Sequence, residues 1–278
     1  MATLPKIASF WFGSDLTWLE QLCIQSYLDR GHEFVLYAKQ PLQNVPDGVE
    51  MRDASEILWP PPFDISNGDR HRIAVFSDIF RLCMIQKTGF IYVDLDAYCV
   101  QAFDFSSPYV FAVSEMGLYP NGVIGLPKDS LALGEMIKFL RAPNPIQPWK
   151  DERFINNKIR RIAKGERWGI EDLAWGNSGP QTFGHFLKQS GEVIHAMPTE
   201  TLYPLAPKQL SILHSVGVED QIERKGVYSL HIYGHQKKHI ATRLGGLPIK
   251  GSYLDRLCKR HNIDPKAAPV RILPWMQA

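Results

Sequence analysis

The strongest constraint on the fold is a strand–helix–strand pattern at the start of the chain. The apolar and aromatic run at residues 7–12 predicts a buried strand. A helix is expected at 16–29, with Asp15 as its N-terminal cap and Gly31 at its end. A second strand is predicted at 33–37. This order favours a parallel sheet covered by helices, and therefore an α/β fold.

The rest of the chain continues the mixture of strands and helices, with less regularity in its second half. Further strands are predicted at 91–95, 109–114, 122–126, 193–196 and 227–233. Further helices are predicted at 72–86, 130–140, 150–164, 182–189 and 253–261. No linker divides the 278 residues, and 45% of them are apolar, which is enough for one full core. We therefore expect a single domain over residues 1–278.

Composition excludes several classes of function. The formal net charge of +2 provides no strong field toward nucleic acid, so no nucleic-acid partner is expected. No run approaches the length of a membrane span, and residues 1–6 lack the features of a secretory signal. We expect a cytoplasmic protein, with peripheral contact to the inner membrane face as an open alternative. The cysteines form no C-x-x-C pair and are expected to be core thiols: Cys23, Cys83, Cys99 and Cys258.

A pair of carboxylates follows the strand predicted at 91–95. Because side chains alternate along a strand, Tyr92, Asp94 and Asp96 are expected on one face. Ligands of open α/β sheets bind beyond the carboxyl ends of the strands. Two neighbouring carboxylates repel each other unless a cation lies between them, and oxygen ligands suit Mg²⁺ or Mn²⁺. A D-x-D tripeptide is nevertheless expected about once by chance in a chain of this composition.

The helix before this strand adds two charged residues. Asp78 and Arg81 are three residues apart and share one helix face. Such a pair is usually a solvated surface ion pair. The tight turn at residues 88–89, however, returns the chain along the helix, so both residues could face the same cleft as Asp94 and Asp96.

Two motifs on this stretch carry a family resemblance. The S-D-x-x-R at 77–81 and the G-F-I-Y-x-D-x-D at 89–96 resemble the signature of the D-x-D glycosyltransferases of family 32. The related clostridial glucosylating toxins share it. Thr88 stands where the family usually has the first of two glycines. The combined spacing is far more specific than D-x-D alone.

The resemblance implies a GT-A fold, in which a Rossmann-like mixed sheet flanked by helices precedes an irregular acceptor-side C-terminal half. Residues 1–126 would then bind the nucleotide sugar, and 127–278 would form the acceptor side and a closing segment at the metal and donor. The implied reaction transfers a hexose from a UDP-sugar, with retention, to a glycan or glycolipid acceptor. The pathway implied is bacterial surface polysaccharide or lipopolysaccharide synthesis.

The resemblance also implies roles for individual residues. Asp96 would bind Mn²⁺ or Mg²⁺ directly, and Asp94 would hold the ribose or complete the metal shell. Asp78 and Arg81 would hydrogen-bond the donor hexose, and Arg81 would offset diphosphate charge. Tyr92 would line the same pocket. These residues are the expected catalytic and donor-binding set.

Three further positions have a functional and a structural interpretation. Trp11 matches the aromatic residue that packs on uracil in the family, or it is a core tryptophan. Asn121 could meet the donor sugar, although Asn-Gly is more often a plain turn. The segment 177–180 resembles the family's G-P loop, and it is equally consistent with a helix N-cap turn.

A histidine near the C-terminus is expected to complete the metal shell. His231 is the candidate that the resemblance favours, and His235 is a substitute. His231, His235 and His239 are four residues apart, which on a helix would favour zinc. Gly234 and the strand-like residues before it argue against that helix.

Retention could arise by front-face attack or through a carboxylate nucleophile. No carboxylate is placed for the second route, so front-face attack is favoured. One alternative function is a phosphatase of the haloacid dehalogenase type, but that family wants Thr or Val where Tyr98 stands. The other is a catalytically silent protein that binds sugar nucleotides.

Overall fold

The computed structural model describes residues 3–273 and 276. Residues 1–2 of the N-terminal segment 1–6 lie outside the described residues. The strands are β1 (Ile7–Trp11), β2 (Phe34–Ala38), β3 (Val49–Asp53), β4 (Ile91–Val93), β5 (Ala97–Cys99), β6 (Val123–Ile124) and β7 (Ser229–His231). The helices are α1 (Trp18–Asp29), α2 (Arg70–Thr88), α3 (Leu131–Leu140), α4 (Glu152–Ala163), α5 (Thr182–Ser190), α6 (Thr199–Leu202), α7 (Glu219–Ile222), α8 (Gly234–Arg243) and α9 (Tyr253–Arg260). None of the described helices is long and apolar enough to cross a membrane.

A mixed sheet lies at the centre, with the strand order β3-β2-β1-β4-β6. The first four strands are parallel, and β6 pairs antiparallel with β4. Ile7 is in register with Phe34 on one side and with Ile91 on the other, so β1 is the middle strand. The predicted fold class, a mixed α/β sheet flanked by helices, is confirmed.

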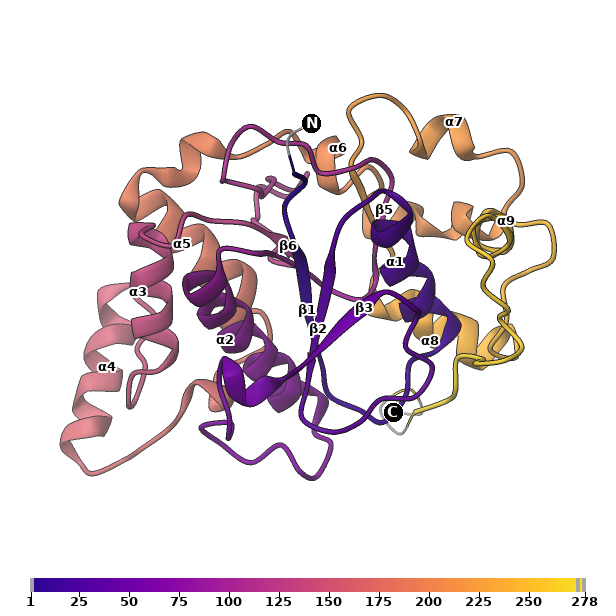
Figure 1. The fold of residues 1–278 in the computed structure, drawn as a ribbon. Coiled ribbons are helices and arrows are strands. Elements are labelled where there is room, and N and C mark those ends of the chain that lie inside the picture. Colours follow the sequence, from indigo (N-terminus) through magenta and orange to yellow (C-terminus); the bar gives the residue numbers. More distant parts are fainter. Residues whose placement is uncertain (1–2, 274–275, 277–278) are drawn as a thin grey trace.

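Helices cover both faces of this sheet (Figure 1). Phe10 points to the side of α2, where its ring lies 4.5 Å from that of Phe80 and 5.4 Å from that of Phe76. Helix α3 packs against α2, and α5 packs against α3, which completes this layer. Ile7, on the opposite face of β1, belongs to the core that contains Ile24 and Tyr27 of α1.

Helix α1 is buried on two sides, which explains why its buried residues are not confined to one stripe. One side faces the central sheet. The other packs against the C-terminal part of the chain, where Trp18 shares a core with Leu254 and Leu257 of α9. The Trp18 indole N–H donates to the carbonyl of Gly246 at 2.8 Å. A two-stranded antiparallel sheet, β5–β7, lies between these two cores.

Several local predictions are wrong. Asp15 does not cap α1, which begins after Thr17; the carboxylate of Glu20 accepts from the Thr17 amide at 2.9 Å and hydroxyl at 2.5 Å. The run at 109–114 makes only isolated bridges to neighbouring segments. Residues predicted as a strand at 193–196 form a 3₁₀ turn in which Ile194 is 81% exposed. An apolar run alone does not distinguish these outcomes.

Glu20 also connects α1 to α8. Its carboxylate is 3% exposed and lies 2.5 Å from the ammonium of Lys237. Glu20→Ala should lower the free energy of unfolding by about 3 kcal/mol, because it leaves a largely buried cation without its carboxylate. Glu33→Ala, which breaks an exposed ion pair with Lys6, should cost less than about 1 kcal/mol. Urea unfolding measures both, and equal losses would contradict the prediction.

Candidate functional site

The site begins with α2 and the turn that follows it. Gly89 has a φ of 75°, a left-handed conformation that favours glycine and ends the helix. The chain then enters β4 alongside the helix. The Arg81 guanidinium lies 4.5 Å over the Tyr92 ring, and the Ser77 hydroxyl lies 3.1 Å from the Tyr92 hydroxyl. The helix and the strand therefore face each other as the sequence predicts.

The two acidic residues are presented by a turn. β4 ends at Val93, and the Asp94 amide donates to the Gly122 carbonyl at 2.6 Å. The Ala97 amide then donates to the Asp94 carbonyl at 3.0 Å, which closes a tight turn containing Asp96. The expectation that strand alternation alone aligns Asp94 and Asp96 is therefore wrong, although both reach the same site.

His231 reaches the site through the second sheet. Ala97 of β5 is in antiparallel register with His231 of β7. The Ile232 amide donates to the Asp96 carbonyl at 2.8 Å, which fixes the two segments beside each other. His235 lies on α8, because Gly234 begins that helix instead of preventing it. The prediction that Gly234 excludes a helix is wrong, but His231 itself is on a strand, so no three-histidine helix face forms.

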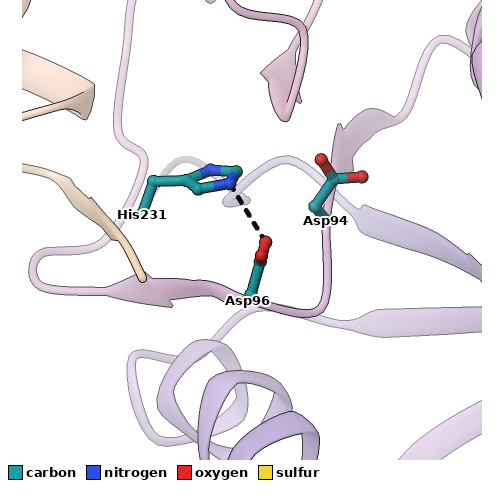
Figure 2. A group of neighbouring side chains, drawn as sticks. All are labelled: Asp94, Asp96 and His231. Atoms are coloured by element: carbon teal, nitrogen blue, oxygen red, sulfur yellow. Dashed lines mark ion pairs between the residues drawn. The ribbon is translucent and has the colours of Figure 1, made fainter. Parts of the chain in front are cut away.

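Asp94, Asp96 and His231 form a cluster in which one possible ligand atom from each lies within 4.8 Å of the others (Figure 2). His231 Nε2 is 3.1 Å from Asp96 Oδ1. No other such cluster of three is found between residues 3 and 273 or at 276. His231, rather than His235, therefore accompanies the two carboxylates.

The donor atoms of this cluster fit a divalent cation. Asp96 Oδ1 and His231 Nδ1 are buried and have no hydrogen-bond partner. Asp96 Oδ1 faces Nε2 of His231, and the unpaired ring nitrogen is the other one, Nδ1. Buried polar atoms are normally paired, so both atoms remain able to bind a ligand. Carboxylates are suitable ligands for Mg²⁺ and Mn²⁺, and the imidazole adds a nitrogen ligand of the kind that transition-metal ions accept. The predicted metal ligands are thus consistent with the geometry.

Arg81 joins the helix to the cluster. Its side chain is 5% exposed and lies 3.2 Å from Asp94 and 3.4 Å from Asp78. It also donates to the Asn121 carbonyl at 2.5 Å. Burial lowers the pKa of Arg81, but Asp94, Tyr92 and Asp78 outweigh this effect and raise the pKa above its ordinary value. The guanidinium is therefore a permanent charge. Burial raises the pKa of Tyr92 to about 12, so its phenol stays neutral.

Asp78 is held by two loops that lie far apart in the sequence. Its carboxylate accepts from Asn121 Nδ2 at 2.8 Å and from Ser178 Oγ at 2.7 Å. A Cβ on Gly179 would lie 3.1 Å from the same carboxylate, so the loop needs glycine to come this close. Burial raises the pKa of Asp78, against the opposing effect of Arg81. Both Asn121 and the segment 177–180 belong to the site.

The N-cap interpretation of residues 177–180 is wrong. The Asn177 side chain donates backward to the Ala174 carbonyl at 2.7 Å, and α5 has no side-chain cap. Trp11, the last residue of β1, is half-buried and donates from its indole to the Asp15 carbonyl at 3.2 Å. Lys237 lies 5.3 Å over its ring. A uracil contact at Trp11 stays a prediction.

The sequence interpretation missed three residues of the site. A Cβ on Gly122 would clash with the His231 ring and would lie 2.8 Å from Asp94 Oδ2. The Tyr203 ring lies 5.9 Å from that of His231. Arg70 interacts electrostatically with Asp96. Only Arg70 has a sequence signal, since it shares the helix face of Ser77 and Arg81 by its spacing.

Gly122→Ala should weaken Mn²⁺ binding about tenfold or more, because the added methyl group displaces His231 and Asp94. Overpacking should also cost about 1–3 kcal/mol of stability. Titration calorimetry measures the affinity. Gly134→Ala in α3 is the matched control, since its Cβ would meet nothing within 4 Å. Wild-type Mn²⁺ affinity in Gly122→Ala would show that this close approach is unrelated to a metal site.

Comparisons with known proteins give a weak likeness among solved structures. No family model matches the chain, and no curated protein matches it. Among solved structures, one similar chain is described as "PaToxG Glycosyltransferase". It shares 17% sequence identity at a TM-score of 0.46, over 68% of this chain and 70% of that chain.

Proposed function

We propose that this chain is a metal-dependent, retaining glycosyltransferase of the GT-A type that transfers a hexose from a UDP-sugar. The observation that carries the proposal is the cluster of Asp94, Asp96 and His231 beyond the end of β4, with unpaired buried ligand atoms. The motif resemblance at 77–81 and 89–96 supports the same activity. We further propose a glycan or glycolipid acceptor of bacterial surface polysaccharide or lipopolysaccharide.

Asp94, Asp96 and His231 would hold a Mn²⁺ or Mg²⁺ ion. When bound, such an ion neutralises the charge that develops on a departing diphosphate. Arg81 would add a fixed positive charge beside it, already oriented by Asp94 and Asp78. Because the pKa of Arg81 is raised, this charge persists at every physiological pH.

Asp78 would orient the donor hexose. Its carboxylate already accepts two hydrogen bonds, from Asn121 and Ser178, and is adjacent to Arg81. A carboxylate stabilised in this way is a poor nucleophile, which favours front-face attack over a covalent intermediate. Tyr92 is 1% exposed beneath Arg81, so its proposed role is to support the guanidinium.

The ion pair of Asp94 also bears on the phosphatase alternative. In haloacid dehalogenases the first aspartate of the motif is the nucleophile. Here Asp94 lies 3.2 Å from Arg81, which reduces the nucleophilicity of its carboxylate. A catalytically silent sugar-nucleotide-binding protein is the remaining alternative. Turnover separates it from an active transferase, since an active enzyme hydrolyses some donor without an acceptor.

Mn²⁺ together with a UDP-hexose should raise the melting temperature of the wild-type protein by about 5 °C or more at saturation. Asp96→Asn should abolish the Mn²⁺-dependent part of this shift, because it removes a charged ligand. Asp220→Asn is the matched control, since this aspartate is exposed on α7, and it should retain the full shift. The measurement is a thermal-shift series with UDP-, GDP- and CMP-sugars, with and without Mn²⁺.

An unchanged shift in Asp96→Asn would overturn the metal-site assignment. The absence of any metal-dependent shift in the wild type with every nucleotide sugar would overturn the proposed function. A shift without release of UDP would favour the silent binding protein.

Retention predicts that the hexose released from a UDP-α-hexose in water first appears as the α-anomer. Front-face attack forms the new bond on the side that the diphosphate leaves. Proton NMR of the anomeric signal, recorded before mutarotation equilibrates the sugar, measures the configuration. Free α-hexose in the same buffer provides the mutarotation control. Initial release of the β-anomer would exclude retention.

A further inference from the structure

Trp175 is an exposed aromatic residue at the edge of the site. Its side chain is 59% exposed, and it precedes the loop residues that hold Asp78 by only a few positions. Large aromatic side chains are normally buried, and one held at the surface beside a polar site often serves to contact a ligand. Trp175 is in none of the hydrophobic clusters formed by the described residues, so core packing does not explain its position.

The segment that carries Trp175 is fixed on both sides. Before it, the His71 ring donates to the Leu173 carbonyl at 2.9 Å. After it, Asn177 donates to the Ala174 carbonyl at 2.7 Å, and its own side-chain oxygen accepts from Gln147 at 3.2 Å. The indole is therefore presented by a rigid loop, which lowers the entropic cost of binding a ligand there.

Arg70 connects this indole to the metal cluster. Its guanidinium lies 5.2 Å over the Trp175 ring, and its charge interacts with Asp96. Gly234, at the start of α8, leaves room for it: a Cβ there would lie 3.3 Å from Arg70 Nη2. Arg70 is thus in contact with the Trp175 ring and close enough to the cluster to sense the charge of Asp96.

The position of Trp175 favours a sugar ring over a nucleotide base. Ser178, on the same loop, hydrogen-bonds Asp78, the residue proposed to orient the donor hexose. The C–H groups on one face of a pyranose are weakly positive and stack on the negative face of an indole. The adjacent guanidinium can donate to ring hydroxyls at the same time.

We propose that Trp175 forms the acceptor subsite, where a pyranose ring of a glycan acceptor stacks on the exposed part of the indole beside Arg70. This inference rests on the proposed glycosyl transfer, and it identifies the acceptor as a carbohydrate. The donor hexose would lie on the inner side, at Asp78 and Arg81, and the acceptor ring on the outer side.

The test uses the full-length, ¹⁵N-labelled protein with Mg²⁺ and UDP, since paramagnetic Mn²⁺ would broaden the signals. The indole N–H resonance of Trp175 is identified by its loss in Trp175→Phe. Lactose, cellobiose and N,N′-diacetylchitobiose are then titrated separately. We expect at least one of them to shift this resonance in a saturable manner.

Trp175→Ala should weaken binding of that saccharide about tenfold, as followed on the remaining resonances, because the stacking surface is lost. Trp175→Phe should retain most of the affinity, since it keeps an aromatic ring. Ile194→Ala, which removes an exposed apolar side chain from another segment, is the control and should bind as the wild type does.

The inference is overturned if none of the three saccharides moves the Trp175 resonance, or if Trp175→Ala binds the saccharide with wild-type affinity. A shift caused by UDP alone, with none from saccharides, would assign Trp175 to the base and overturn it as well. Failure of the proposed function is distinguishable, because it appears as the absence of a metal-dependent shift with nucleotide sugars in the wild type.

Discussion

The buried guanidinium of Arg81 is the interaction on which the site depends. A cation at 5% exposure is stable only if its surroundings compensate the loss of water. Asp94, Asp78 and the Asn121 carbonyl supply that compensation from a turn, a helix and a loop. The charge therefore fixes three segments relative to one another. It also balances the two carboxylates at the end of β4, whose mutual repulsion would otherwise oppose folding.

The junction between the two sheets positions His231, the third residue of the cluster. The central sheet ends at Val93, and the chain crosses into the small β5–β7 sheet within a few residues. Asp94 and Asp96 lie in that crossing, between the two sheets. His231 follows from the pairing of β7 with β5, a contact between residues far apart in the sequence. A metal bound at this junction would couple the C-terminal part of the chain to the central sheet.

How far the sequence predicts such a site depends on the distance between its parts along the chain. The unit from Ser77 to Asp96 is contiguous, and helix periodicity with one tight turn is enough to predict that its charged residues converge. His231 and Ser178 come from distant segments, where only the family resemblance pointed to them. The predictions of strands at 109–114 and 193–196 are wrong because an apolar run does not by itself determine secondary structure. Tertiary packing decides whether such a run pairs with a neighbouring strand.

Two glycines of the site make close contacts that the sequence pattern does not predict. Gly122 and Gly179 appear in the sequence as ordinary turn residues, Asn-Gly and Gly-Pro. In the structure they allow backbone to approach His231 and Asp78 at distances that a Cβ would prevent. Both glycines pack against polar groups of the site, and neither has a positive φ. Glycine is therefore needed because a larger side chain would not fit, and not because the backbone has an unusual conformation. A site assembled by such close packing tolerates little displacement, and this would restrict a bound cation to the position that the surrounding charges define.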